Sequence, residues 1–565
     1  MAEYLSPGVY MEEYDNSPRT IEGVGTSTAG FVGMAVKGPA AGAPVFVPSY
    51  AEFIRIFGGP LNEFIHGEYR YLASSVEQFF ANGGTRCYVS RVTAEDAAPA
   101  YLRAGIFRAE AVNEGSWGNR IQLHFSTVLK KKLQLLEQKG DRTYRARSTA
   151  GFAEGDLVFT DGNYNRIQMI YDNNVTFEEP FGLDVVDGGL VPERVLYLLE
   201  TQLQIRYLEE AEVYGNLSFN IASPDYILSR LERSRLIRAA LTGETGMGNP
   251  VEAILGEGVS FGTLTLEGGS DGSMEQVNAG TFIGQDQGAG RRTGIQAFLE
   301  NATVNMMAVP GVTIPEVMVS LVAHCETMGS RFAVLDMPKE MWDTGELLRY
   351  REMIDSTYAA MYHPWLRNFD RSTQKEGYFP PSGAVMGIYA RTDSSRGVHK
   401  APANETVLCS GLKVSFTRQE QDILNPAGIN LIRALPGQGI RVWGARTAGS
   451  NSAFRYVNVR RLFIYVEESI RANTGWVVFE PNDASLWTRV RLTVSGFLET
   501  LWRSGMLAGA APEESFFVEI GPSTMTEDDI RNGRLICNIG IAPSRPAEFV
   551  IFRVTQFTSE AASRR

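Results

Sequence analysis

Few side chains in this sequence have both the types and the spacing that chemistry requires. The five histidines stand at positions 66, 124, 324, 363 and 399, with no HxH or HxxxH pair that could hold a metal ion. The four cysteines stand at positions 87, 325, 409 and 537, which gives no CxxC pair and no disulfide framework. We therefore expect no metal site and no catalytic cysteine.

Three short stretches resemble parts of active sites. The glycine-rich run at 288–294 lacks the lysine of a phosphate-binding loop, so we interpret it as a structural turn. His324 and Cys325 are neighbours on a predicted helix and would point about 100° apart, which favours core packing over a nucleophilic pair. Asp336 ends a predicted strand without a recognisable partner, which favours a helix cap or a loop role. We expect no catalytic residue and no cofactor.

The composition is that of a globular protein. The chain has 565 residues, of which 44% are hydrophobic and 21% charged, enough for about three or four domains with cores of their own. The net charge of −12 argues against a nucleic-acid partner. The first residues lack the pattern of a secretory signal, and no apolar run is long enough for a membrane helix. We expect a soluble protein made in the cytoplasm.

The elements expected around these residues are those of an α/β (α+β) multidomain protein. Buried strands are predicted over 29–36 and 87–92, with a helix between them over 69–80. Strand, helix and strand recur from 305 to 336, at a spacing that predicts a parallel βαβ unit. A long amphipathic helix is predicted from Leu486 to Leu501.

Turn signals divide the rest of the chain. Residues 96–270 alternate short strand-like runs with turns, which is typical of a β-rich insertion on an exposed face. Both ends have strand-like arms without a local partner, and such arms need another sheet to pair with. The predicted organisation is an N-terminal linker arm (1–20), the first part of the core α/β domain (21–95), the outward-facing insertion (96–270), an α/β domain (271–435) and a C-terminal domain ending in a strand arm (436–565).

Arginine is concentrated near the end of the chain. Residues 421–565 contain 16 arginines, no lysine and 14 acidic residues, while the rest of the chain has a net charge of −14. Two segments there combine tryptophan, tyrosine and arginine, the residue types that dominate protein–protein hot spots. They indicate either a core with exposed arginines or an assembly surface. The candidate assembly or tube-facing residues are Arg446, Arg455, Arg460, Arg461, Arg489 and Arg503.

At this point the sequence resembles a known family, the contractile tail sheath proteins of phages, phage-tail-like bacteriocins and extracellular contractile injection systems. The resemblance covers both ends and most of 271–565, and it is weakest over about 130–260. The ordered set of motifs is specific, although each alone would be weak. The matching motifs are PGVYMEE, TSTAGFVGMAVKGP, FFANGGTRCYVSRV, GSWGN, RRTGIQAF, VWGART, YVNVRRLFIYVEESI, WVVFEPND, LWRSGMLAG and DDIRNGRLICNIGIAPSRPAEFVIFRVTQ.

The resemblance implies a structural motor. Such a subunit polymerises in six-membered helical layers around an inner tube, and the sheath contracts from a metastable extended state to drive the tube through a target envelope. Its partners would be further copies of itself, the tube protein, and baseplate and terminator proteins, in a phage tail or a tail-like particle. No nucleic acid and no inserted membrane is implied. Each subunit would donate terminal strands to a neighbour, which assigns the arms to Val9, Tyr10, Met11, Glu12, Phe549, Val550, Ile551, Phe552 and Val554.

Two other readings of the sequence stay open. An α/β enzyme or a nucleotide-driven assembly factor could use residues 271–435. An inner tube or baseplate protein is a third possibility, although tube proteins are usually far shorter.

Overall fold

The centre of the molecule is a nine-stranded sheet assembled from two distant parts of the chain. The computed structural model describes residues 20–181 and 190–551. Six central strands of the sheet run parallel and the marginal pairings are antiparallel. In spatial order the strands are β2 (Val45–Val47), β3 (Cys87–Val92), β1 (Ala29–Met34), β17 (Met306–Ala308), β18 (Phe332–Asp336), β19 (Ala359–His363), β24 (Ile429–Leu435), β25 (Gly439–Val442) and β22 (Glu405–Thr406).

Helices cover both faces of this sheet, which explains why its strands are nearly all apolar. Within β1, Phe31 belongs to one core and its neighbour Val32 to the other. The predicted βαβ unit is confirmed, because α7 (Pro315–Met328) connects the parallel strands β17 and β18. We call the sheet and its helices the body. The other helices of the body are α1 (Tyr50–Phe57), α2 (Glu63–His66), α3 (Leu72–Ala81), α6 (Ala279–Ile283), α8 (Thr344–Arg351), α9 (Ser382–Arg396) and α10 (Arg418–Leu424).

Short elements complete the body and its connections. A small sheet contains β20 (Leu366–Asp370), β21 (Lys375–Phe379) and β23 (Gly411–Leu412). The 3₁₀ turns of the described residues are η1 (Gly67–Tyr69), η2 (Ser116–Arg120), η3 (Met274–Gln276), η4 (Gly294–Glu300), η5 (Ser452–Phe454) and η6 (Gly475–Val477).

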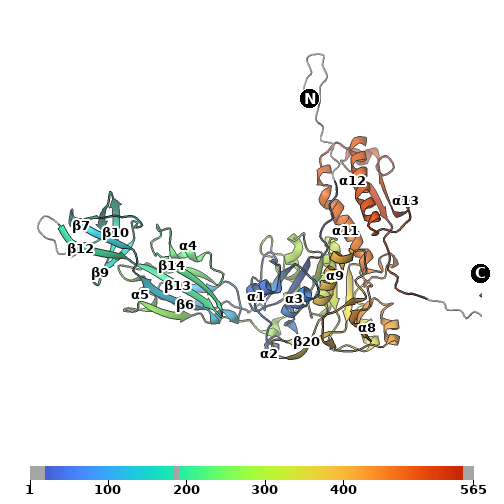
Figure 1. Ribbon diagram of the computed structural model, residues 1–565, viewed down its shortest axis with the longest axis horizontal. Helices are drawn as coiled ribbons and strands as arrows, with labels where there is room; N and C mark the ends of the chain where they lie inside the picture. Colours follow the sequence, from blue (N-terminus) through green and yellow to red (C-terminus); the bar gives the residue numbers. More distant parts are fainter. Residues whose placement is uncertain (1–19, 182–189, 552–565) are drawn as a thin grey trace, which may run out of the picture.

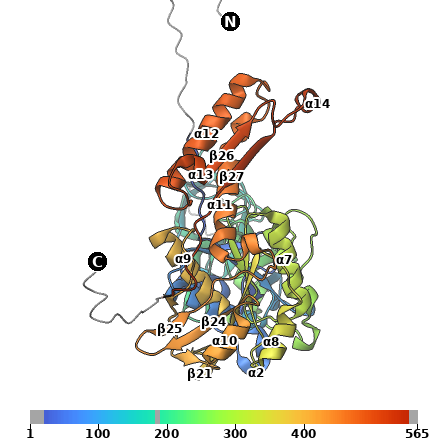
Figure 2. The same cartoon turned by 90° about the vertical axis from the view of Figure 1, so that its right-hand side faces the viewer.

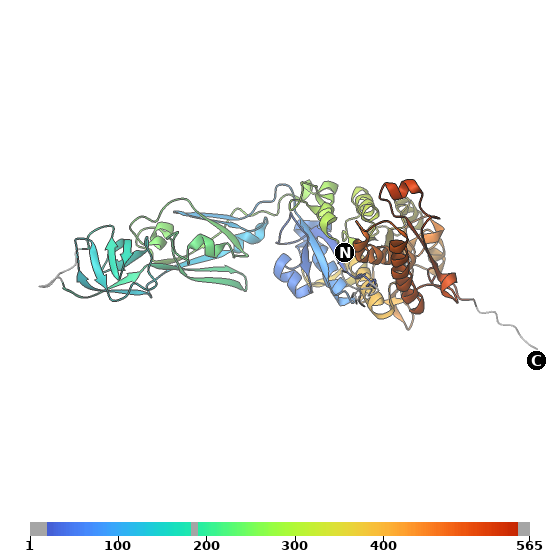
Figure 3. The ribbon, with the colours of Figure 1, turned by 90° about the horizontal axis from the view of Figure 1, so that it is seen from above.

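Between β3 and η3 the chain leaves the body and forms two further units in a row (Figures 1 and 3). The first, which we call the β unit, packs two sheets and two short helices around a core that contains Trp117 and Phe125. Its elements are β4 (Tyr101–Ala104), β5 (Phe107–Ala111), β6 (Gln122–Val128), β13 (Glu200–Tyr207), β14 (Glu210–Leu217), α4 (Ile227–Leu231), β15 (Ile237–Leu241), α5 (Pro250–Leu255) and β16 (Phe261–Thr265).

The second unit is a closed six-stranded barrel, nested within the β unit. The chain enters the barrel after Val128 and returns at Glu200, and these two residues pair with each other across β6 and β13. Figure 1 shows the barrel at the far end of the molecule from the body. Its strands are β7 (Lys132–Gln138), β8 (Thr143–Ala146), β9 (Leu157–Thr160), β10 (Asn163–Tyr171), β11 (Asn174–Phe177) and β12 (Leu190–Leu198).

Two long helices and a two-stranded sheet form a C-terminal unit beside the body (Figure 2). The predicted amphipathic helix is confirmed as α12 (Ala484–Arg503), which buries Leu486, Val490, Val494, Phe497 and Leu501. Asp483 caps it by accepting a hydrogen bond from the backbone amide of Leu486. The other elements are α11 (Val457–Asn473), α13 (Pro512–Ser515), β26 (Phe516–Ile520), α14 (Glu527–Arg531) and β27 (Cys537–Ile541).

Candidate assembly interface

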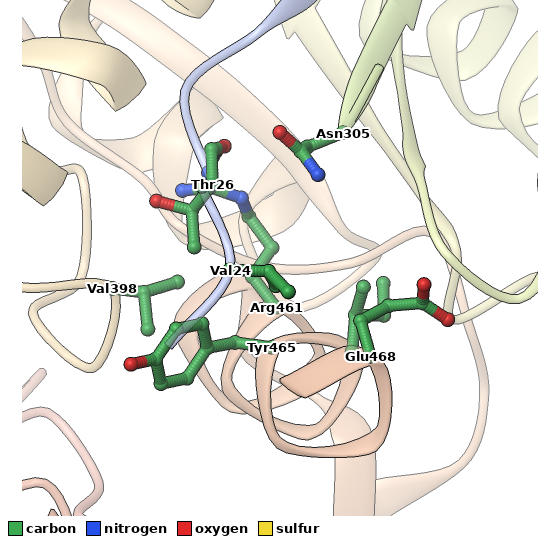
Figure 4. Close-up of a pocket in the computed structure, with 9 residues that line it drawn as sticks. Val24, Thr26, Asn305, Val398, Arg461, Tyr465 and Glu468 are labelled. Atoms are coloured by element: carbon green, nitrogen blue, oxygen red, sulfur yellow. Dashed lines mark hydrogen bonds between the residues drawn. The ribbon is translucent and has the colours of Figure 1, made fainter. Parts of the chain in front are cut away.

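The first described residues, which we call the N-terminal root (20–28), lie along helix α11. Figure 4 shows Val24 and Thr26 on the segment that crosses this helix near Arg461 and Tyr465. The amide of Val24 donates to Ser469 Oγ at 3.1 Å, and Asn473 Nδ2 donates to the carbonyl oxygen of residue 22 at 2.9 Å. The cavity left beside the root measures only about 10 Å³, which is far too small for a ligand. The contact is therefore structural.

A buried ion pair fixes the inner end of this root. Arg461 donates two hydrogen bonds to Asp393, at 2.9 and 2.6 Å, and both side chains are more than nine-tenths buried. Thr26 joins the pair twice: its hydroxyl donates to Asp393 and its carbonyl oxygen accepts from Arg461. Burial alone would lower the pKa of Arg461, but Asp393 raises it above its ordinary value. Arg461 is therefore held as a cation that ties the root to the body.

The last described residues leave the molecule at Glu548. We call residues 542–548 the C-terminal root. The Glu548 carboxylate accepts two hydrogen bonds from Arg446, at 2.9 and 2.7 Å, one from Asn425 at 2.7 Å and one from Tyr456 at 2.9 Å. Burial opposes ionisation, yet these donors hold the pKa of Glu548 below its ordinary value. A charged Glu548 is thus a fixed point of the chain.

Beyond Glu548 the described chain is open to solvent. Phe549, Val550 and Ile551 are 72%, 67% and 78% exposed and belong to no strand of the described chain. Three consecutive exposed apolar residues are unusual on a soluble subunit. Their pairing with a neighbour stays a prediction. The other predicted arm residues, Val9 to Glu12, Phe552 and Val554, lie outside the described residues.

The sheet of the C-terminal unit has unpaired edges. Strands β26 and β27 pair only with each other in the described chain, through five residue pairs from Phe516–Ile541 to Ile520–Cys537. The inner face packs on α12, while Phe517 on the outer face is 54% exposed and lies over Gly540. An isolated pair of strands is marginally stable and offers main-chain donors and acceptors along both outer edges.

The predicted arginines fall into two groups. Arg446, Arg460 and Arg461 are at most 8% exposed and face partners within the chain; the Arg460 guanidinium lies 3.6 Å from the Phe454 ring centre. Arg455, Arg489 and Arg503 are exposed, and the last two pair with Glu480 and Glu499. The role of all six as assembly or tube contacts stays a prediction. Thr26, Asp393 and Glu548 are not predictable as contact residues from the sequence, because a lone polar residue carries no spacing signal.

In the three stretches that resemble active-site motifs, the side chains make structural contacts. In the turn at 288–294, Arg292 pairs with Asp286 and Glu300. His324 is buried, and its Nε2 accepts from Arg331 at 3.1 Å. The Asp336 carboxylate accepts from the Gly311 amide and from the amide and hydroxyl of Ser382, the first residue of α9. Asp336 therefore binds the first turn of α9 from a distant strand, whereas the N-cap residue of that helix is Pro381.

The described residues contain neither a metal-binding cluster nor a helix that could cross a membrane. In 20–181 and 190–551 no group of three or more His, Cys, Asp or Glu side chains could hold a metal ion. No helix within those residues has the length and the apolar character needed to cross a bilayer.

Anchored roots, exposed apolar residues and open sheet edges are typical of a subunit that assembles with further copies. Two family models match the chain without a gap: the phage tail sheath protein central domain over 288–448 and the phage tail sheath C-terminal domain over 449–557. Residues 288–557 therefore belong to the phage tail sheath family. This is a family of structural proteins and not of enzymes, so the alternative of an α/β enzyme is set aside.

Individual relatives agree with this assignment. A prophage major tail sheath protein of Pseudomonas aeruginosa is 25% identical over 291 residues, which are 49% of this chain and 73% of that protein. The tail sheath protein of Burkholderia phage BcepMu is 25% identical over 307 residues, or 50% of this chain and 63% of that protein.

Solved structures share the fold over nearly the whole chain. The sheath complex of the PVC extracellular contractile injection system, in its contracted state, has a TM-score of 0.54 at 21% identity and covers 99% of this chain and 100% of that one. A sheath tail protein of Listeria innocua has a TM-score of 0.52 at 13% identity, and the match covers 93% of this chain and 96% of that one. The α/β fold with its β-rich insertion is thus one that sheath proteins adopt.

Proposed function

We propose that this chain polymerises into a helical sheath around an inner tube and contracts from an extended, metastable state to drive that tube through a target envelope. The observation that carries the proposal is the two-stranded β26–β27 sheet with open outer edges. It belongs to a subunit whose N-terminal and C-terminal roots are both anchored. Similar structures include the contracted sheaths of the PVC and AFP particles and an AFP baseplate, which supports the same partners here.

The arms of neighbouring copies would complete the open sheet. Residues 1–20 of one copy and 549–557 of another would add strands to the outer edges of β26 and β27. Strand addition supplies main-chain hydrogen bonds, each worth about 1 kcal/mol net. Because each arm belongs to one subunit and each sheet to another, the links continue from copy to copy and do not close on a pair.

Contraction needs no fuel in this scheme. Each subunit has two packings that differ in free energy, and the arms keep neighbours linked while near-rigid bodies rotate and slide. A small difference per subunit becomes large when it is summed over the sheath. In the assembled tube, the body and the C-terminal unit would form the inner layer, and the β unit and the barrel would face outward.

Deletion of residues 1–20 tests the proposal. We expect a folded, monomeric subunit with unchanged circular dichroism that forms no long tubes in electron micrographs, because the body keeps its cores and only the linking arm is lost. The full-length chain should form tubes under the same conditions. Contractile tubes of normal length from the deletion variant would contradict strand sharing, and discrete particles from the full-length chain would contradict the sheath function.

A further inference from the structure

Helix α11 contacts both the N-terminal root and the C-terminal root. The N-terminal root contacts Arg461, Ser469 and Asn473 of α11. These positions follow one another at eight and four residues, so they share one face of the helix. Tyr465 lies on the same face, and a side chain at residue 23 would meet its hydroxyl, because a Cβ built there lies 1.9 Å from that oxygen. The root is therefore seated on α11 over about three turns.

The C-terminal root meets the first turn of the same helix, which begins at Val457. Tyr456, the residue before α11, donates its hydroxyl to Glu548. Asn458 in the first turn donates to the carbonyl oxygen of His399 at 2.7 Å and lies 3.5 Å from that of Ser544. The roots thus sit at two sites of one rigid element, both tied to the body.

The anchoring ends abruptly on the C-terminal side. Glu548 accepts four hydrogen bonds, whereas the next residue, Phe549, is 72% exposed. Motion of the C-terminal arm relative to the body must begin after this carboxylate, because before it the chain is held by charge-assisted bonds.

We infer that Glu548, Tyr456 and α11 are positioning elements that fix where and in which direction the two arms leave the subunit. This inference rests on the proposed function. With both roots held by α11, the distance between the arm origins stays constant while the body moves, and the hinges lie outside residues 22 and 548. A subunit with a loosened root still folds. Its arm, however, leaves the subunit in a range of directions, so the helical twist between neighbouring subunits varies.

Glu548 gives a cleaner test than Asp393. The Arg461–Asp393 pair is buried on both sides, and its loss would destabilise the body itself. Glu548 lies at the rim with a side chain that is 19% exposed, so Glu548→Gln keeps the shape and removes the charge. Tyr456→Phe removes only the hydroxyl that connects α11 to Glu548. Asp225→Asn, which breaks the pair with Arg230 in the β unit, is the matched control.

The experiment measures amide exchange in the unassembled subunits and helical twist in the assembled tubes by cryo-electron microscopy. For Glu548→Gln we expect exchange at the Ser544 amide, which donates to the carbonyl oxygen of Met506, to rise about 10-fold, with a thermal midpoint close to that of the unmodified chain. Its tubes should show a wider spread of twist or break at short lengths. Tyr456→Phe should show the same change to a smaller degree, and Asp225→Asn should show none.

The tubes of the unmodified chain test the proposed function, and the tubes of the variants test the positioning role. If the unmodified chain forms no tubes, the proposed function is wrong. If it forms tubes and Glu548→Gln forms tubes with the same twist and spread, the positioning role is wrong. Should Glu548→Gln lower the thermal midpoint markedly, Tyr456→Phe decides, and tubes of unchanged spread from that variant overturn the inference.

Discussion

At the scale of single residues, buried polar groups in this protein tie segments together and do not react. Arg331 is fully buried and donates to the carbonyl oxygens of Phe298 and Asn301 and to Nε2 of His324. Because the guanidinium donates, that imidazole nitrogen must accept, so His324 is neutral. Arg461 and Glu548 act in the same way at the roots. Such residues fix the path of the chain and have a structural role.

Because two histidines are buried, we expect acid to lower the stability of the isolated subunit. Burial, with Arg331 nearby, lowers the pKa of His324 to about 4, and burial lowers that of His363 to about 4. Both values lie below the ordinary 6.5, so the unfolded chain takes up protons that the folded chain refuses. The contribution of these two histidines to stability should therefore be complete above about pH 6.5 and be lost toward pH 4, by up to about 3 kcal/mol per histidine.

Urea unfolding of the unassembled subunit at pH 7 and pH 5 measures this loss. His363→Asn should reduce the difference between the two pH values, even if it lowers stability at both. His124→Asn, at a half-buried position on β6, is the control. An equal pH dependence for the unmodified chain and the His363 variant would contradict the prediction.

At the scale of elements, one carboxylate joins a strand end to a helix start. Asp336 ends β18, and its oxygens accept from Gly311 at 3.0 Å and from the amide and hydroxyl of Ser382 at 2.8 and 2.7 Å. Burial, the largest influence, raises its pKa to about 6 despite these donors. A parallel sheet commonly places reactive groups at this edge, but here the edge is occupied by a cap.

Asp336→Ala should destabilise the subunit by about 2–4 kcal/mol. The substitution leaves two buried amides without an acceptor, and each costs about 1–3 kcal/mol. Asp336→Asn retains an acceptor and should lose about half as much or less. Denaturant unfolding gives both values, and an alanine variant as stable as the unmodified chain would show that the cap is not used.

Elements with a clear period could be predicted from the sequence, and pairings between distant elements could not. The stripe from Leu486 to Leu501 predicted α12, and the alternation around 305–336 predicted β17, α7 and β18. Nothing in residues 29–34 indicates that β1 pairs with β17, because a strand buried on both faces has no mark for its neighbour. The contacts at the roots could not be predicted either, because Thr26 meets Asp393, and Glu548 meets Arg446, only after folding.

At the scale of the whole molecule, the units extend from the body to the barrel in one direction. Figure 3 shows the β unit and the barrel extending away from the body and the C-terminal unit. Arg91 strengthens the first joint, because it is 2% exposed and donates to the carbonyl oxygens of Ala35, Gly38 and Glu114. The proposed layering of the sheath agrees with this shape, because both arm roots lie at the body and the C-terminal unit, away from the barrel (Figure 1).

Limited proteolysis of assembled tubes tests the layering. Cleavage should occur first within 96–270, for example at the turn of β10 and β11, where Tyr171 is 75% exposed and Asp172 and Asn173 have positive φ values. The C-terminal unit should be cut more slowly in tubes than in free subunits, because neighbours would cover it. Preferential cleavage of tubes within 440–540 would contradict the arrangement.

The pairing of Val128 with Glu200 makes the barrel an exchangeable module. The chain leaves the β unit and returns to it at two residues that are already neighbours in an antiparallel ladder. Whatever is carried between them adds little loop-closure entropy to the host, because its ends need not be brought together again. Evolution could replace the barrel with another fold, or an engineer with an enzyme or an affinity tag, while the register of β6 and β13 stays the same. A sheath built from such subunits would display one guest domain per copy, at a regular spacing set by the lattice.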